Sequence, residues 1–236
     1  MIEGTDIMLT QLEMKQTLLV ALEANDFETV RTLALQSRKV LSVLVRLAYD
    51  KTSLTGWRAI KAIGHVASLY VRNNYDFLRD TIRKLLWSLS DESGGIGWSA
   101  PEILGEIVSA DPKKLADIVP LIAEVYSIEE KVFRPGVLYA LKRIAETCPE
   151  SIEPFQEIVL SGLSEHDPLA RIYALELLML LKNKLDSEAL DRARRQVISL
   201  GQDRTEVWTY RDGGFMGLEV GEVANEVREQ LNKMIP

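Results

Sequence analysis

Residues 57–66 decide the fold of this 236-residue chain; they read Trp57-Arg58-Ala59-Ile60-Lys61-Ala62-Ile63-Gly64-His65-Val66. The same pattern returns 41 residues later as Trp98-Ser99-Ala100-Pro101-Glu102-Ile103-Leu104-Gly105-Glu106-Ile107. Residues 133–141 match the same pattern another 35 residues later, with Ala140 at the position of Gly64 and Gly105. After 34 more residues, Tyr173-Ala174-Leu175 matches Tyr139-Ala140-Leu141. An all-helical repeat of this period predicts an α-solenoid, in which a small central residue lets neighbouring helices approach closely.

Helical periodicity extends over most of the chain. In the first segment, Met8, Leu12, Leu19 and Leu22 keep close to the 3.6-residue spacing of one helix face. The segments predicted to be helical are 8–24, 27–35, 38–49, 53 or 55 to 71, 75–90, 98–110, 113–126, 133–147, 152–163, 168–182 and 187–200. Their short connections favour antiparallel neighbours.

The C-terminal segment departs from the repeats. Residues 206–220 alternate large and polar side chains around Asp212-Gly213-Gly214, which predicts a β-hairpin. Residues 221–234 predict a last amphipathic helix. The sequence therefore indicates one domain, 1–236, with repeats over about 26–200 and a hairpin and capping helix over about 201–236. We expect the hairpin to cap the open end of the solenoid; the alternative is an aromatic recognition element formed by Trp208, Tyr210 and Phe215.

Composition favours a soluble cytoplasmic protein. The chain is 47% hydrophobic, but no apolar run approaches the roughly 20 residues of a membrane span. The first residues lack a basic stretch followed by an apolar one, so no signal peptide is predicted. The single cysteine, Cys148, excludes an intrachain disulfide, and with only two histidines no zinc-ligand spacing exists. No cofactor is predicted.

Charge is unevenly distributed along the chain. The net charge of −7 argues against general nucleic-acid binding. Residues 31–90, however, hold eleven Lys and Arg against three acids, whereas the part from 101 onward holds 16 basic and 24 acidic residues. This asymmetry is compatible with ordinary solvated helix faces. It is also compatible with an anionic partner at the basic end or with electrostatic orientation of a protein partner.

The repeat pattern resembles HEAT repeats, in the looser form seen in phycobilin lyases and many prokaryotic proteins. The resemblance covers about residues 26–200 and implies an all-α, α-α superhelix of the HEAT or armadillo-like kind. Residues 91–102 also resemble a bacterial subgroup of HEAT-repeat proteins. Such motifs are specific for fold and say little about activity.

Trp87 stands out among the candidate binding residues. On a helical wheel of residues 75–90, Leu78, Ile82, Leu85, Leu86 and Leu89 form the core side, and Trp87 falls roughly opposite. An exposed tryptophan among charges suits a binding anchor, although packing on a neighbouring turn would explain it equally well. The charged residues beside it are Asp76, Asp80, Arg83 and Lys84.

The same wheel places acidic residues on the next two second helices, which line the concave face in HEAT-like arrays. They are Asp117, Glu124, Glu153 and Glu157. If these helices stack, the groove becomes acidic along its length and suits a basic peptide or protein. Solvation of the same carboxylates is the simpler interpretation.

The segment between residues 91 and 98 is rich in glycine. Gly94, Gly95 and Gly97 precede Trp98, and backbone N–H groups there could face an anion. The segment lacks the Lys-Ser/Thr of a P-loop and the preceding strand of a dinucleotide fingerprint, so a connector between repeats is the default interpretation.

The sequence favours a non-catalytic scaffold that binds an unidentified protein partner on its concave face, because solenoids offer long surfaces. The alternative is an enzyme: the chain is similar in size and repeats to HEAT-like bacterial glycosylases that act on alkylated DNA. Such an enzyme would need a basic cleft, with Trp87 and Asp76 or Asp80 at its centre. A cofactor-handling role by analogy with phycobilin lyases is a third possibility, for which no residue argues.

Overall fold

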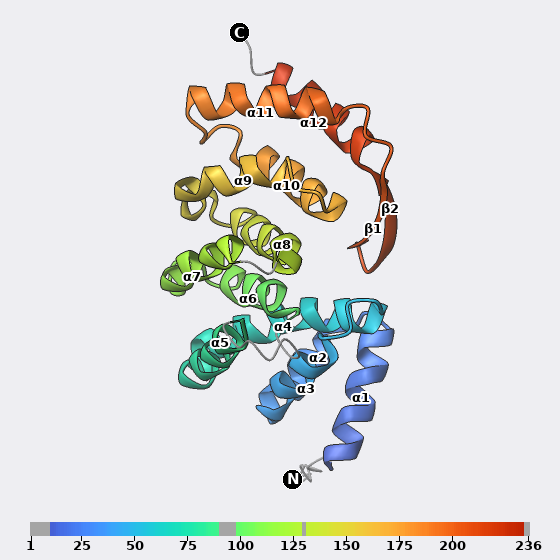
Figure 1. Ribbon diagram of the computed structural model, residues 1–236. Helices are drawn as coiled ribbons and strands as arrows, with labels where there is room; N and C mark the ends of the chain where they lie inside the picture. The colour runs from blue at the N-terminus through green and yellow to red at the C-terminus, as the bar shows by residue number, and fades with distance from the viewer. Residues whose placement is uncertain (1–9, 90–97, 129–130, 234–236) are drawn as a thin grey trace.

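A computed structural model describes residues 10–89, 98–128 and 131–233. Two layers of helices stack into an elongated array, with the N-terminus at one end and the C-terminus at the other (Figure 1). The predicted all-α solenoid is therefore confirmed, and the predicted hairpin lies beside it. No helix in the described ranges is long and apolar enough to cross a membrane.

The first helices of the pairs form one row and the second helices form the other (Figure 1). The N-terminal helices are α1 (Gln11–Glu23), α2 (Phe27–Gln36) and α3 (Lys39–Leu47). The first-helix row contains α4 (Leu54–Asn73), α6 (Ala100–Ser109), α8 (Arg134–Ala145), α10 (Pro168–Leu181) and α12 (Val220–Asn232). The second-helix row contains α5 (Tyr75–Leu89), α7 (Val119–Glu124), α9 (Gln156–Gly162) and α11 (Ser187–Leu200).

Local sequence sets most helix boundaries. The side chains of Asp26, Ser53, Asp167 and Asp186 each accept a hydrogen bond from a first-turn backbone N–H, as N-caps do. Thr10 and Glu13 form a reciprocal capping box at the start of α1. These caps explain why α2, α4, α10 and α11 begin within a residue or two of their predicted positions.

Two second helices are more broken than the periodicity predicts. In place of a helix over 113–126, short 3₁₀ turns η1 (Ala116–Ile118) and η2 (Val125–Ser127) flank α7. In place of a helix over 152–163, the turns η4 (Pro149–Ser151) and η5 (Glu153–Phe155) precede the shorter helix α9. A further 3₁₀ turn, η3 (Lys131–Phe133), precedes α8. Pro120 and Pro154 lie near these breaks, and a proline lacks the backbone donor that an uninterrupted helix needs.

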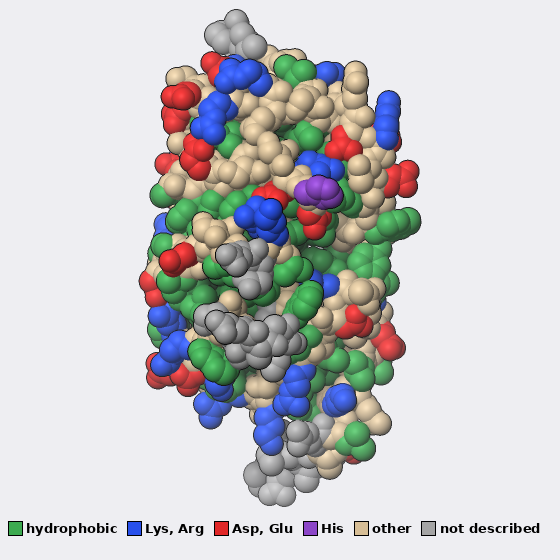
Figure 2. All heavy atoms as spheres, viewed as in Figure 1, with side chains coloured by type: hydrophobic (Ala, Val, Ile, Leu, Met, Phe, Trp, Pro, Cys, Tyr) green, Lys and Arg blue, Asp and Glu red, His purple; other side chains and the backbone are tan. Residues whose placement is uncertain are grey.

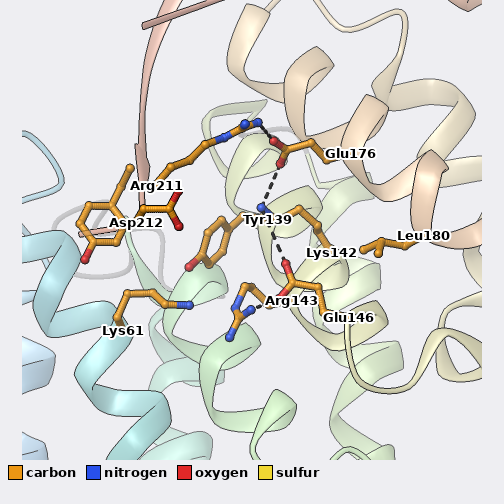
Figure 3. Close-up of a pocket in the computed structure, with 10 residues that line it drawn as sticks. Lys61, Tyr139, Lys142, Arg143, Glu146, Glu176, Leu180, Arg211 and Asp212 are labelled. Carbon is orange, nitrogen blue, oxygen red and sulfur yellow. Dashed lines mark hydrogen bonds and ion pairs between the residues drawn. The ribbon is translucent and has the colours of Figure 1, made fainter. Parts of the chain in front are cut away.

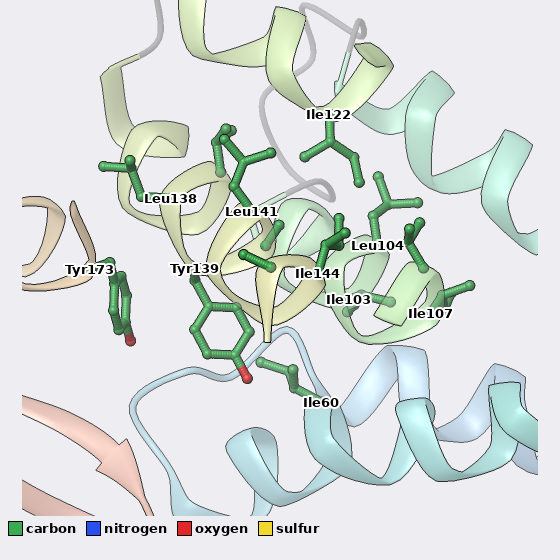
Figure 4. Packing of buried hydrophobic residues seen from close by; sticks show 14 of the residues in the cluster. Ile60, Ile103, Leu104, Ile107, Ile122, Leu138, Tyr139, Leu141, Ile144 and Tyr173 are labelled. Carbon is green, nitrogen blue, oxygen red and sulfur yellow. The ribbon is translucent and has the colours of Figure 1, made fainter. Parts of the chain in front are cut away.

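One continuous hydrophobic core runs between the two rows (Figure 4). Ile60 of α4, Leu104 of α6 and Leu141 of α8 are fully buried in it, next to Ile122 of α7. The contact between α6 and α8 is especially close: a Cβ on Gly105 would lie 2.5 Å from the Ala140 Cα and 2.7 Å from its Cβ. The predicted role of the small central residue is therefore confirmed at this pair.

The hairpin consists of β1 (Glu206–Arg211) and β2 (Gly214–Glu219), paired antiparallel through the two-residue turn Asp212-Gly213. Both turn residues have positive φ, 50° and 87°, as the tight hairpin turn requires. The expectation that the hairpin caps the C-terminal end is wrong. Helix α12 packs there against α10 and α11, whereas the hairpin runs back along the first-helix row to α4 (Figure 1).

Arg58 of α4 anchors the tip of the hairpin. Its Nε and one terminal nitrogen donate to the Gly213 carbonyl at 3.1 and 2.8 Å, and its other terminal nitrogen donates to the carbonyls of Leu22 and Glu23. The Tyr210 ring stacks on Trp57 with 5.8 Å between centroids. The hairpin therefore connects the last repeats to the first.

Replacing Arg58 with alanine is expected to loosen the hairpin, because both hydrogen bonds to the Gly213 carbonyl are lost. Amide exchange in β1 and β2 should accelerate about tenfold or more, while exchange in α8 stays unchanged. Hydrogen–deuterium exchange with mass spectrometry measures both segments. Arg204→Ala is the control, since Arg204 pairs with Glu219 at the exposed base of the same hairpin. Equal hairpin exchange in wild type and Arg58→Ala would show that Arg58 does not hold the tip.

Candidate functional site

Helix α6 carries two glutamates, Glu102 and Glu106, one turn apart in an otherwise apolar sequence. Both are buried. Glycines on the neighbouring helices leave space for both side chains. A Cβ on Gly64 would lie 2.8 Å from a carboxylate oxygen of Glu106, and a Cβ on Gly136 would lie 2.6 Å from a carboxylate oxygen of Glu102. The packing between α4, α6 and α8 therefore accommodates two carboxylates.

Glu106 is the centre of a buried polar network. Its Oε1 accepts hydrogen bonds from Lys61 Nζ at 2.7 Å, from the Tyr139 hydroxyl at 2.6 Å and from Arg143 Nε at 2.8 Å. A second Arg143 nitrogen lies 3.3 Å from Oε2. Three helices of the first-helix row are thus joined through one side chain.

The ionised form of Glu106 is favoured in spite of its burial. Burial by itself raises the pKa of Glu106, but the charges of Lys61 and Arg143 and their hydrogen bonds outweigh it and hold the pKa below its ordinary value. Burial, together with the charge of Glu106, keeps the pKa of the Tyr139 hydroxyl well above its ordinary value. At neutral pH Tyr139 is therefore a donor to a carboxylate.

Glu102 makes a simpler contact at the other end of α6. Its Oε1 accepts a hydrogen bond from Lys51 Nζ at 2.7 Å, and the same ammonium donates to the Trp98 carbonyl at 2.8 Å. Its Oε2 is buried and has no hydrogen-bond partner among the residues that the structure describes.

A second polar network joins α8, α10 and the hairpin. Lys142 Nζ donates to Glu176 at 2.9 Å, and Arg211 of β1 pairs with the same carboxylate. The Lys142 ammonium also lies 5.5 and 5.4 Å from the ring centroids of Tyr139 and Tyr173, within cation–π range. Burial, followed by the positive charges of Arg211 and Arg143, lowers the pKa of Lys142 to about 8.

These networks form the wall of a pocket of about 520 Å³ between the first-helix row and the hairpin (Figure 3). We call it the hairpin pocket. Its lining residues are Lys61, Tyr139, Lys142, Arg143, Glu146, Glu176, Leu180, Tyr210, Arg211 and Asp212. The volume is in the range of small-molecule sites in proteins.

Of the partner-binding residues predicted on the helices, none that the structure describes lines the hairpin pocket. The side chain of Trp87 is 69% exposed at the end of α5, and that of Trp98 is 50% exposed just before α6. Asp76, Asp80, Arg83 and Lys84 are exposed on the same helix, and Asp80 pairs with Arg83. The wheel prediction that Trp87 faces away from the core is confirmed. Gly94, Gly95 and Gly97 lie outside the described residues.

Three of the four acidic residues expected along the second helices form ion pairs with neighbouring repeats. Asp117 accepts two hydrogen bonds from Arg79 at 3.0 and 2.7 Å, and Glu157 accepts two from Arg192 at 2.8 and 3.0 Å. Glu153 pairs with Lys184 at 2.8 Å. Glu124 is exposed. These carboxylates join adjacent repeats, so the surface offers a basic partner less negative charge than the sequence suggests.

One face of the molecule carries acidic and basic side chains mixed together (Figure 2). Figure 2 shows several Lys and Arg side chains toward the lower end, where the N-terminal helices lie, and interspersed acidic and basic side chains above. The basic segment predicted from the sequence thus gathers at one end of the array.

Sequence reasoning did not single out the residues of the hairpin pocket. The available signal was the pair Glu102 and Glu106, four residues apart in an apolar helix and therefore on one face. Lys142, Glu176 and Arg211 carried no comparable signal, because ordinary solvated helix and strand faces contain the same residue types. Within the described ranges, no three His, Cys, Asp or Glu side chains are arranged to hold a metal ion.

The similarity of this chain to known proteins is weak. No family model matches the sequence, and no curated protein matches it. The chain is similar to a solved archaeal HEAT-like repeats protein from Thermococcus onnurineus NA1, at 15% identity and a TM-score of 0.41, over 97% of this chain and 99% of the other. At that level the similarity carries no functional argument; the assignment of a helical repeat fold rests on the helix packing described above.

Proposed function

We propose that this helical repeat protein is a non-catalytic interaction module that holds a protein partner at the surface of α5, anchored by Trp87. The observation that carries the proposal is the exposure of tryptophan. Three of the four tryptophans expose half or more of the side chain: Trp87 (69%), Trp98 (50%) and Trp208 (70%). Large aromatic side chains are mostly buried in folded proteins and are enriched at the centres of protein interfaces.

Trp87 has the surroundings of an interface anchor. Asp76, Asp80, Arg83 and Lys84 follow the same stripe of α5, at spacings that place them on the side where Trp87 lies. All four are exposed. A partner that buries the indole in an apolar pocket would meet a rim of both charges, which is the usual anatomy of a protein interface.

Replacing Trp87 with alanine is expected to weaken binding of the partner by about 10- to 100-fold, because hot-spot tryptophans contribute most of the affinity of an interface. The partner is first captured from a lysate of the source organism and purified. Its affinity for wild type and for Trp87→Ala is then measured by titration calorimetry.

Trp208→Ala is the matched control. Trp208 is equally exposed, but it lies on the hairpin, on the opposite side of the array from α5 (Figure 1). A partner whose affinity falls with Trp208→Ala and not with Trp87→Ala would place the interface on the hairpin and refute the proposal. Recovery of duplex DNA alone, lost steeply as salt rises, would instead support nucleic-acid binding and lead to a glycosylase assay on alkylated duplex.

A further inference from the structure

Four aromatic rings form a continuous ladder across the first-helix row. Tyr173 of α10 meets Tyr139 of α8 edge to face with 5.4 Å between ring centroids (Figure 4), and Tyr139 meets Trp57 of α4 in the same way at 5.4 Å. Tyr210 of β1 then stacks on Trp57 at 5.8 Å, with 3° between the ring planes. Aromatic pairs attract each other at such separations, so the ladder joins α10, α8 and α4 to the hairpin.

The hairpin contacts both ends of this ladder. The Thr209 side chain is buried, and its hydroxyl oxygen lies 3.0 Å from that of Tyr173, within hydrogen-bond distance. The next residue, Tyr210, reaches the other end of the ladder, because successive strand residues point to opposite faces. Arg211 adds an ion pair with Glu176 of α10. The strand β1 therefore connects α10 directly to α4, although α6 and α8 lie between these helices in the row.

The position of the hairpin depends on these contacts. It has two strands of six residues each, and an isolated two-stranded hairpin is marginally stable in water. Its outer side is open to solvent, where Trp208 is 70% exposed and Met216 is 44% exposed. An element that is packed on one side through few buried side chains opens locally at lower free energy than the core around it.

We propose that the hairpin is a releasable strap, which holds the two ends of the first-helix row together while it is closed on the aromatic ladder. In a helical repeat array each repeat contacts mainly its neighbours, so small displacements between neighbours add up along the array. A direct connection between α10 and α4 limits this sum. When the strap is released, Trp57 loses its cover and α4 and α10 move apart while the helices themselves stay folded.

The strap is a different part of the molecule from the α5 surface. Its contacts involve α4, α8 and α10 of the first-helix row, whereas the proposed partner surface lies on α5 of the second-helix row. Either proposal can therefore fail without the other.

A distance measurement between the ends of the array tests the restraint. Spin labels are attached at Gln36→Cys in α2 and Arg195→Cys in α11, two exposed positions, with the buried Cys148 replaced by serine. Double electron–electron resonance then gives the distribution of distances between the labels. In the variant that combines Arg58→Ala with Tyr210→Ala, we expect this distribution to broaden and to shift to longer distances. The helical circular dichroism should stay unchanged.

Two control variants keep the strap closed. Tyr210→Phe keeps the ring that stacks on Trp57, and Arg204→Ala changes only the exposed base of the hairpin. Both should give the distance distribution of the parent protein. A second releasing variant, Arg58→Ala with Thr209→Val, removes hydrogen bonds but keeps every aromatic ring, and it should shift the distances in the same direction.

Hydrogen exchange shows whether the strap is released. In the wild type, amides of β1 and β2 should exchange faster than those of α8 and α10, because release does not require unfolding of the row. Both releasing variants should accelerate exchange in the hairpin further. Equal exchange in hairpin and helices of the wild type would overturn the proposal, and so would an unchanged distance distribution in variants whose hairpin exchanges faster. Hairpin exchange that neither variant accelerates would show that these contacts do not hold the strap.

Discussion

Replacing Glu106 with glutamine is expected to lower the free energy of unfolding by about 3–5 kcal/mol near neutral pH, the usual cost of removing one partner from a buried ion pair. The carboxylate accepts hydrogen bonds from Lys61, Tyr139 and Arg143 in the packing between α4, α6 and α8. An amide keeps the shape but removes the counter-charge of Lys61 and leaves Arg143 with Glu146 alone. Urea unfolding followed by circular dichroism measures the loss.

The effect of the substitution should depend on pH in a defined direction. The pKa of Glu106 in the folded chain lies below its ordinary value of 4.5, because Lys61 and Arg143 outweigh the effect of burial. A group with a lowered folded pKa stabilises the protein above its unfolded pKa, and this contribution is lost as pH falls through the folded pKa. The difference in stability between wild type and Glu106→Gln should therefore be full above about pH 5 and should shrink with further acidification.

Glu157→Gln is the control for this prediction. Glu157 also accepts hydrogen bonds from an arginine, Arg192, but the pair is exposed on α9 and α11 and screened by water. Its loss is expected to leave stability nearly unchanged. Equal unfolding midpoints for Glu106→Gln and Glu157→Gln would show that the buried network adds nothing to the stability of the repeats.

Replacing Gly105 with valine is expected to cost about 3 kcal/mol or more, the upper range for over-packing. A Cβ at this position meets the backbone of Ala140 at 2.5 Å, and backbone atoms cannot rotate away as a flexible side chain can. Helices α6 and α8 would have to separate. Gly105→Ala should cost less, because alanine brings one carbon and gains about 1 kcal/mol of helix propensity.

Gly214→Val is the control for the glycine series. An added Cβ at Gly214 finds no atom within 4 Å, and the residue lies in β2, where valine is favoured. Thermal unfolding of the three variants should rank Gly214→Val closest to wild type, then Gly105→Ala, then Gly105→Val. A Gly105→Val protein as stable as wild type would mean that the two helices do not approach as closely as the structure shows.

Much of the fold was predictable because its determinants are local or periodic. The recurrence of Gly64, Gly105 and Ala140 marks the repeats, and short polar residues such as Ser53 and Asp186 mark helix starts. The hairpin was predictable from Asp212-Gly213, which suits the positive φ values of its turn. The broken helices α7 and α9 were not, because an apolar period persists through a 3₁₀ turn and hides the interruption.

The candidate site was far less predictable. The exposure of Trp87 followed from its place on the helix wheel, since the apolar face of an amphipathic helix is buried wherever the helix lies. The ion pairs of Asp117 and Glu157 did not follow, because their partners are 35 or more residues away on another helix. Whether a carboxylate is free or paired depends on how adjacent repeats align.

By itself, the sequence determined the class of fold, the repeat period, the turn of the hairpin and the exposed side of α5, all of which depend on residues close along the chain. Only the tertiary structure decided that the hairpin returns to α4 and encloses a pocket. Lys61, Glu106, Lys142, Glu176 and Arg211 come from five elements and meet only when the array is stacked. Their pairing depends on distance and burial, because two opposite charges interact strongly only when the fold brings them close together and partly removes them from water.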